Sequence, residues 1–463
     1  MKDKLRHIPP VEFILQSSHF EGIIQEYGRG LVLYAVQEEI KLIWSLILRS
    51  EFNENEVKPE NLIVPVKKRI SASLKPSLQK VLNGTGVILH TNLGRAILAD
   101  EALEIMRMIS ASYSNLEYDV TNGIRGSRYD HCTRLLSELT GGVSALVVNN
   151  GAAALVLALR CMAAKKNVLV SRGELVEIGG GFRIPEILEC SGASLSEVGS
   201  TNRTRIQDYK KAAEATNAGA ILKVHRSNFN MTGFTEETSL EELVELGTEM
   251  NLPVIYDLGS GLLQDPKKFG LPVDEPTPRE SLEAGADIVI FSGDKLLGGP
   301  QSGILVGKGI EWIDKMRRNP LCRALRVDKT TLASLEATLA LHRDPELAVT
   351  KIPILKMLNA SIDELTERAS KVIEALGEAT VRLETKECRS IMGGGTFPEF
   401  EIPSIGLEAR LPGCSPDEFA QRLRQLEVPL ISRVENDMLI IDLRTIVHDQ
   451  DHLLIDCLSG PFS

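Results

Sequence analysis

The sequence predicts an α/β protein built around a mostly parallel sheet. Between about residues 80 and 345, short apolar runs rich in β-branched side chains alternate with segments of helical periodicity. Runs this uniformly apolar are typical of strands whose two faces are both covered by helices, as in parallel α/β sheets. The five clearest runs span residues 145–148, 168–170, 220–224, 254–256 and 288–291.

Three domains are expected, because one hydrophobic core rarely serves a chain of 463 residues. The segments that flank the α/β pattern have patterns of their own, helical before it and mixed α+β after it. The predicted domains are a helical module over residues 1–65, a large α/β domain over 66–345 and a small α+β domain over 346–463.

The two flanking domains are predicted from local patterns. Apolar residues between 11 and 50 recur at helical spacing, with a break at residues 27–30. The polar stretch that follows contains Pro59 and Pro65 and is interpreted as a linker. In the last domain we expect one helix and two strands, over residues 362–376, 405–411 and 438–443.

The composition indicates a globular protein of a reducing compartment. It is 43% hydrophobic and 25% charged, and no apolar run is long enough to cross a bilayer. The first residues lack the apolar block of a signal peptide. The seven cysteines form no CxxC pair, which argues against a disulfide framework or a zinc site. We therefore expect a cytoplasmic protein with neither a membrane segment nor a bound metal.

Charge gives little support for nucleic-acid binding. The net charge is −11, yet residues 61–99 hold six Lys or Arg and no acid. From charge alone, a solvated surface segment is the favoured interpretation of this stretch. The alternative is a local face that attracts anions on an otherwise acidic protein.

Each of three strands is followed by one component of a cofactor site. After strand 145–148, Gly151 and Ala152 open a helix, where bare backbone amides favour a phosphate. After strand 254–256 comes Asp257, a carboxylate suited to a protonated pyridine nitrogen. Small residues also suit any strand-to-helix turn, and an aspartate there is often only a helix cap.

Lys295 follows the fifth strand, where a partly desolvated amine becomes nucleophilic toward an aldehyde. Ser292, three residues earlier, can add a hydroxyl to a phosphate site. A lysine on a loop is more often a surface residue. The ordered series of phosphate turn, aspartate and lysine, each after its own strand, favours the functional interpretation.

This order and spacing resemble the fold-type I pyridoxal-5′-phosphate (PLP) enzymes, the aspartate aminotransferase architecture, with Lys295 as the Schiff-base lysine. Residues 226–233 resemble the segment that often carries an Asn near the pyridine 3-hydroxyl. A narrower set of motifs resembles bacterial selenocysteine synthase, the L-seryl-tRNA(Sec) selenium transferase family, over nearly the whole chain. Those motifs are YGR at 27–29, NGTGVILHTNLGR at 83–95, GSR at 126–128, ELVEIGG at 174–180 and DLRT at 442–445.

The resemblance implies a reaction and a set of partners. L-Seryl-tRNA(Sec) would be converted to L-selenocysteinyl-tRNA(Sec) by PLP-dependent β-elimination of the seryl hydroxyl and addition of selenium from selenophosphate. The helical module would bind the tRNA. The family also implies a homo-oligomer, with a decameric ring as one form and active sites between subunits.

By the same resemblance, an arginine cluster holds the phosphate-like selenium donor. Its members would be Arg95, Arg128, Arg323 and Arg326, of which the last two share a face if their stretch is helical. Without the resemblance, an arginine pair on a helix is usually a solvated face. His225 just after a strand has either a cofactor contact or a structural role, and Cys322 beside the arginines is the cysteine of interest.

Two rival functions are weighed. A related PLP lyase that acts on an amino-sugar acid phosphate would share the large-domain motifs and also need arginines. Such lyases generally lack the N-terminal helical module, so residues 1–65 favour the tRNA enzyme. A non-catalytic tRNA-binding protein on the same fold is disfavoured by the presence of Lys295 and Asp257.

Overall fold

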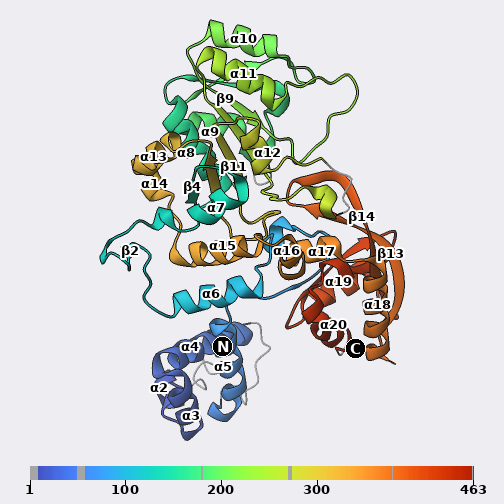
Figure 1. The fold of residues 1–463 in the computed structure, drawn as a ribbon. Helices are drawn as coiled ribbons and strands as arrows, with labels where there is room; N and C mark the ends of the chain where they lie inside the picture. Colours follow the sequence, from blue (N-terminus) through green and yellow to red (C-terminus); the bar gives the residue numbers. More distant parts are fainter. Residues whose placement is uncertain are drawn as a thin grey trace. The chain divides into compact units, whose positions relative to one another are not determined.

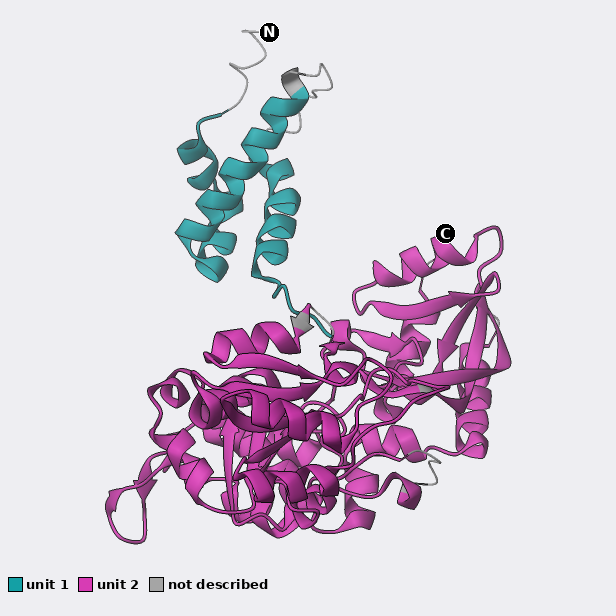
Figure 2. Ribbon diagram, turned by 90° about the horizontal axis from the view of Figure 1, so that it is seen from above, with its two compact units in different colours: residues 1–80 teal, residues 81–463 magenta. Residues whose placement is uncertain are grey.

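A computed structural model describes residues 9–48, 58–178, 181–269, 274–377, 379–460 and 462. The chain forms two compact units, residues 1–80 and residues 81–463 (Figure 2). Among the described residues, no helix is both long and apolar enough to cross a membrane. Each unit has a hydrophobic core of its own.

Unit 1 is a helical bundle, as the periodicity predicts. Its core is formed by Ile14, Phe20, Val36 and Val66, among others, all fully buried. The predicted break falls at Gly28, between the second and third of its helices. The described helices are α2 (Val11–Leu15), α3 (Ser18–Tyr27), α4 (Arg29–Leu48) and α5 (Pro59–Leu74).

The linker predicted around Pro59 and Pro65 is wrong for the part that the structure describes. Pro59 opens α5, where a proline costs no helical hydrogen bond, and Pro65 lies within the helix. Leu62, Val66 and Ile70 of α5 point into the core of the bundle. This packing outweighs the proline signal, so the helical unit extends to residue 80 rather than 65.

The centre of unit 2 is a seven-stranded sheet in the order β4-β12-β11-β10-β9-β5-β8 (Figure 1). β12 runs antiparallel to both of its neighbours, and the other six strands run parallel, so the predicted mostly parallel sheet is confirmed. The strands are β4 (Ser144–Val148), β5 (Asn167–Ser171), β8 (Ser194–Val198), β9 (Ala218–Val224), β10 (Val254–Gly259), β11 (Ile288–Ser292) and β12 (Gly303–Gly307).

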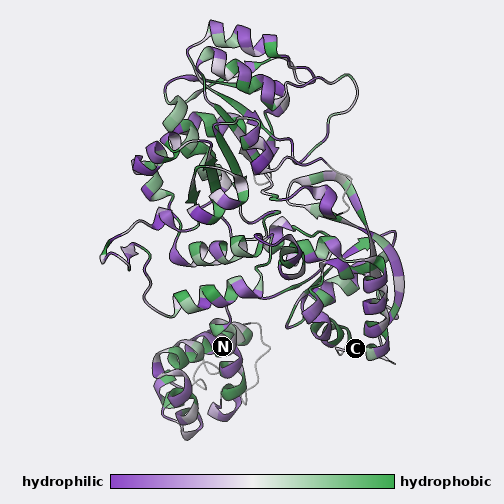
Figure 3. Ribbon diagram, viewed as in Figure 1, coloured by the Kyte–Doolittle hydropathy of each residue, from purple (hydrophilic) through white to green (hydrophobic). Residues whose placement is uncertain are grey.

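Helices cover both faces of this sheet, which explains why its central strands are mostly apolar (Figure 3). α7, α10, α11, α12 and α15 pack on one face, and α8, α9 and α13 pack on the other. The helices that precede the C-terminal sheet are α6 (Asp100–Ser110), α7 (Thr133–Thr140), α8 (Gly151–Ala163), α9 (Ile184–Ser191), α10 (Ile206–Ala215), α11 (Leu240–Met250), α12 (Pro278–Glu283), α13 (Glu311–Arg318), α14 (Pro320–Ala324), α15 (Lys329–Leu341), α16 (Pro345–Lys351) and α17 (Pro353–Asn359).

A second, five-stranded sheet lies in the C-terminal part, in the order β1-β15-β16-β14-β13. β1 is parallel to β15, so residues 82–84 belong to this sheet and not to the large domain in which sequence order places them. Its strands are β1 (Leu82–Gly84), β13 (Arg382–Gly393), β14 (Thr396–Arg410), β15 (Leu430–Glu435) and β16 (Met438–Asp442), and its helices are α18 (Ile362–Leu376), α19 (Pro416–Arg424) and α20 (Asp451–Leu458). Two hairpins of two-residue strands complete the fold, β2 (Tyr118–Asp119) with β3 (Ile124–Arg125) and β6 (Glu177–Ile178) with β7 (Phe182–Arg183).

The DLRT motif at 442–445 has a structural role in this second sheet. Asp442 is fully buried, and its carboxylate accepts hydrogen bonds from Ser390 Oγ at 2.8 Å and Ser404 Oγ at 2.7 Å. Arg433 Nη1 lies 3.1 Å from the same carboxylate. These contacts join β13, β14, β15 and β16, so a buried charge is here compensated by several donors.

Candidate active site at the strand ends of the central sheet

Three predicted site segments meet at the carboxyl edge of the central sheet. Asp257 lies in the last half of β10, Lys295 follows β11, and α8 begins directly after β4. This edge is where ligands bind in parallel α/β sheets. β12 is inserted between β11 and β4, so the α8 N-terminus approaches Ser292 across one intervening strand.

Lys295 is buried, with 5% of its surface exposed. Burial lowers the pKa of the Lys295 amine, while Asp257 raises it and Arg95 lowers it further. Gly259 at φ +69° lies beside the amine, and a Cβ there would sit 3.5 Å from Lys295 Nζ. The glycine therefore leaves the space next to the amine open for a ligand.

Asp257 is also buried, and its backbone position is set by the ladder between β9 and β10. Burial raises the pKa of the Asp257 carboxyl to about 6, against the attraction of Lys295, a hydrogen bond from Gly259 N at 3.1 Å and the charge of His225. Asp257 lies within a strand and caps no helix, so the capping alternative is wrong.

The α8 N-terminus and Ser292 together form a cradle whose donors would suit an anion. Asn150 caps the helix by accepting the amide of Ala153 at 2.8 Å, which leaves the amides of Gly151 and Ala152 without a partner inside the helix. A Cβ on Gly151 would lie 2.9 Å from Ser292 Oγ. Only a glycine at 151 lets the hydroxyl and the helix amides approach the same point.

Arg95 lies on the Lys295 side of the site. One of its guanidinium nitrogens is 2.8 Å from the carboxylate of Asp294, the residue just before Lys295. Ala96 N donates to the carbonyl oxygen of Asp294 at 3.3 Å. Arg95 has φ +63°, a conformation that is strained for a residue with a side chain and that clusters at functional sites.

The other three predicted arginines lie together in a different pocket of about 440 Å³. Arg128, Arg323 and Arg326 line it, with Glu117 as the acid that pairs with Arg128 at 2.7 Å. The hydrogen bond from Arg128 is the largest of the interactions that hold the pKa of Glu117 below its usual value. Sequence reasoning missed three further arginines of the same lining, which are Arg125, Arg317 and Arg318.

The condition for a shared helical face of Arg323 and Arg326 is not met, because α14 ends at Ala324 and Arg326 instead forms an isolated β-bridge with Val148. Among the described residues, neither Arg95 nor Lys295 lines the arginine pocket.

Other predicted candidates have structural surroundings. Cys322 is fully buried, and burial raises the pKa of its thiol, which makes it a poor nucleophile. Asn228 Nδ2 donates to the carbonyl oxygen of Glu177 at 2.9 Å. Residues 179–180 of the ELVEIGG motif lie outside the described residues. No group of three or more metal-binding side chains is found in the described parts of the chain.

Sequence reasoning missed a buried acid beside the site. His225, directly after β9, lies 3.0 Å through Nε2 from Glu275 Oε2. Glu275 belongs to the irregular segment before α12, some fifty residues from His225 and with no motif around it. No sequence signal connects the two residues.

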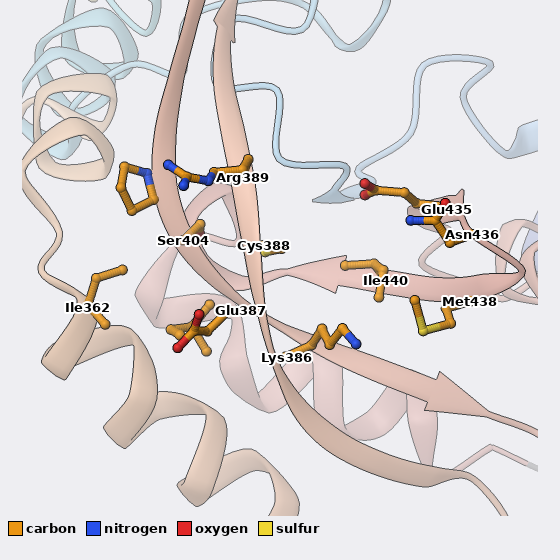
Figure 4. Close-up of a pocket in the computed structure, with 12 residues that line it drawn as sticks. Ile362, Lys386, Glu387, Cys388, Arg389, Ser404, Glu435, Asn436, Met438 and Ile440 are labelled. Atoms are coloured by element: carbon orange, nitrogen blue, oxygen red, sulfur yellow. The ribbon is translucent and has the colours of Figure 1, made fainter.

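A further cavity, of about 530 Å³, lies in the C-terminal sheet (Figure 4). Lys386 and Cys388 of β13 line it, together with Met438 and Ile440 of β16. None of the predicted site residues belongs to its lining. Burial raises the pKa of the Cys388 thiol to about 12, which makes this cysteine unreactive at neutral pH.

The strand order and the buried lysine and aspartate define a class, the α/β proteins with the fold of fold-type I PLP-dependent transferases. A solved structure of D-glucosaminate-6-phosphate ammonia-lyase is similar, with a TM-score of 0.58 over 82% of this chain and 95% of that chain. At 19% identity this likeness concerns the fold alone.

Sequence comparison narrows the class. The profile of the family described as L-seryl-tRNA selenium transferase matches residues 81–447. An L-seryl-tRNA(Sec) selenium transferase of Carboxydothermus hydrogenoformans is 46% identical over 96% of this chain and 95% of the relative. One of Geobacter sulfurreducens is 43% identical over 97% of this chain and 98% of the relative. The chain belongs to the L-seryl-tRNA selenium transferase family.

Proposed function

We propose that this chain converts L-seryl-tRNA(Sec) to L-selenocysteinyl-tRNA(Sec) with pyridoxal 5′-phosphate as cofactor and selenophosphate as selenium donor. Its family membership supports the reaction. The assignment of the cofactor rests on one observation. Lys295, Asp257 and the α8 cradle lie together at one edge of the sheet. All seven cysteines are free thiols, which suits a reducing cytoplasm.

The residues at the sheet edge fit PLP in charge and shape. Gly151, Ala152 and Ser292 would hold the phosphate with two amides and a hydroxyl. Asp257 would hold the protonated ring nitrogen, whose positive charge offsets the cost of burying the carboxylate. Lys295 would bind the aldehyde carbon, because burial favours its neutral, nucleophilic amine.

PLP supplies an electron sink that allows a seryl ester to lose its α-proton and then its β-hydroxyl. Lys295 Nζ, whose neutral form burial favours, would be the base that takes that α-proton. The arginine pocket binds the donor, since planar guanidinium groups donate paired hydrogen bonds to phosphate oxygens. Arg95, held by Asp294, contributes a positive charge on the Lys295 side.

The separation of Arg95 from the other arginines supports a homo-oligomer. The pocket of Arg128, Arg323 and Arg326 contains no residue of the Lys295 site of its own chain. We infer that this pocket faces the Lys295 site of a neighbouring subunit. A closed ring such as a decamer would give every subunit such a neighbour.

Unit 1 is proposed to bind the tRNA. The net charge of residues 1–60 is −3, but the following stretch has exposed lysines that can contact phosphates. These are Lys67, Lys68, Lys75 and Lys80.

A variant without residues 1–80 should keep PLP binding, because unit 2 has its own core. It should lose the preference for seryl-tRNA(Sec) over seryl-tRNA(Ser) in a filter-binding competition. Retained preference would place recognition in unit 2.

The cofactor assignment is tested by trapping. Purified enzyme should absorb near the visible edge, and borohydride reduction should attach the cofactor to Lys295, as located by peptide mass spectrometry. Lys295→Ala should show no attachment, whereas Lys308→Ala, a change at an exposed lysine, should behave as wild type. Attachment at another lysine in Lys295→Ala contradicts the assignment. Release of ammonia from an amino-sugar acid phosphate, with no activity on seryl-tRNA, would favour the lyase instead.

A further inference from the structure

His225 and Glu275 form a hydrogen-bonded pair next to Asp257. His225 N donates to the carbonyl oxygen of Asp257 at 2.8 Å, which extends the β9–β10 ladder by one residue. Its imidazole Nε2 lies 3.0 Å from Glu275 Oε2. The His225 side chain is 20% exposed and that of Glu275 only 3%. The main-chain bond therefore ties the pair to the residue that would hold the cofactor ring.

Only one oxygen of the Glu275 carboxylate is hydrogen-bonded within the described residues. Its second oxygen, Oε1, is buried and has no hydrogen-bond partner there. A buried carboxylate is costly unless it is hydrogen-bonded, so the contact with the His225 imidazole compensates the burial of Glu275. Glu275 also acts on the site itself, since its charge raises the pKa of the Lys295 amine.

We propose that His225 and Glu275 are a positioning pair, which fixes Asp257 and balances the charge around the PLP ring. This inference rests on the proposed function, because the ring is the group that Asp257 would hold. The ionisable groups that interact with His225 are Glu275 from the segment before α12 and Asp257 from β10, and both of these also interact with Lys295 after β11. His225 in its charged form lowers the pKa of Asp257 and so favours its carboxylate.

The pH at which the bound PLP chromophore deprotonates distinguishes a charge pair from a packing contact. Glu275→Gln keeps the shape but removes the negative charge, so the bound chromophore should deprotonate at lower pH. His225→Gln leaves the Glu275 carboxylate without its imidazole partner, so its negative charge acts more fully on the site and the chromophore should deprotonate at higher pH. Each shift should be roughly half to one pH unit for charges at this separation in a partly buried site.

The experiment records the absorbance spectrum of each PLP-loaded enzyme from pH 6 to 10. It is paired with titration of each apoenzyme with PLP and with the thermal midpoint of each apoenzyme. Glu283→Gln, the same change at an exposed residue of α12, is the matched control. We expect opposite shifts for the two variants, a three- to ten-fold weaker PLP affinity in each and no shift in the control. The double variant should shift less than either single one.

The outcomes separate this inference from the proposed function. If wild-type enzyme gains no chromophore with PLP, both are overturned. If wild type loads normally but both variants titrate as wild type does, only the pair is overturned. Shifts in the same direction, with a lowered thermal midpoint, would show a packing role and would also overturn it. Should His225→Gln fail to fold, His225→Asn and Glu275→Gln carry the same test.

Discussion

We expect the Asp257 carboxylate to lower the free energy of unfolding of the apoenzyme. Its carboxyl is buried in β10, and burial raises its pKa from 3.8 to about 6. Above that pH the folded protein holds a buried carboxylate that an unfolded chain would expose to water. Asp257→Asn removes this charge and keeps the shape of the side chain. The variant apoenzyme should therefore be more stable than wild type at pH 8, although it loses most turnover.

The magnitude follows from linkage between protonation and folding. A carboxyl whose pKa is higher in the folded state binds more protons there, so the free energy of unfolding falls as pH rises from about 4 to 6. A shift of about two pH units corresponds to about 3 kcal/mol above pH 6. The attraction of Lys295 is already contained in this pKa, so the expected gain for Asp257→Asn at pH 8 is about 3 kcal/mol. Near pH 5 the gain should fall to about half.

The assay is the thermal midpoint of apoenzyme at pH 8 and at pH 5. With an unfolding entropy of about 2.1 cal/mol/K per residue over residues 81–463, the gain corresponds to a rise of about 4 °C at pH 8. Asp274→Asn, at a residue whose side chain is 92% exposed, should change neither midpoint. An Asp257→Asn apoenzyme less stable than wild type at pH 8 would refute the reasoning. PLP should raise the midpoint of wild type more than that of the variant.

Two further predictions concern anions. Gly151→Ala should force Ser292 Oγ out of the cradle, because the new Cβ would lie 2.9 Å from it, and PLP should bind about ten-fold more weakly by fluorescence titration. Wild-type affinity in this variant would show that the cradle holds no phosphate. Arg323→Ala should raise the KM for selenophosphate about ten- to hundred-fold, the value of a lost charged hydrogen bond of about 1.5–3 kcal/mol, and leave seryl-tRNA affinity unchanged. Arg134→Ala, an arginine of α7 outside the pocket, is the control, and a loss of tRNA affinity in Arg323→Ala would contradict the donor role.

The strands buried on both faces were the parts of the fold most readily predicted from the sequence. The five apolar runs became β4, β5, β9, β10 and β11, because a strand between two helical layers must be apolar on both sides. β8 was missed because it alternates serine and glutamate with apolar residues at the sheet edge. β12 was missed because it begins and ends with glycine, a residue that disfavours strands.

The observed domain boundaries differ from the predicted ones because they depend on which segments are neighbours in space. β1 pairs with β15, almost 350 residues away, and no local pattern near Leu82 indicates that partner. α5 keeps Pro65 because its apolar stripe packs into the unit 1 core. Both corrections come from contacts between segments distant in the chain.

The sequence by itself determined the components of the site, since Gly151, Asp257 and Lys295 each follow a strand whose apolar run is visible locally. Their meeting follows from the rule that parallel strands present their carboxyl ends at one edge. Only the tertiary structure separated Arg95 from the pocket of Arg323, and only it joined His225 to Glu275. Such side-chain contacts depend on how the loops cross the edge of the sheet. The paths of these loops are set by packing between distant segments, and this packing produces no periodic pattern in the sequence.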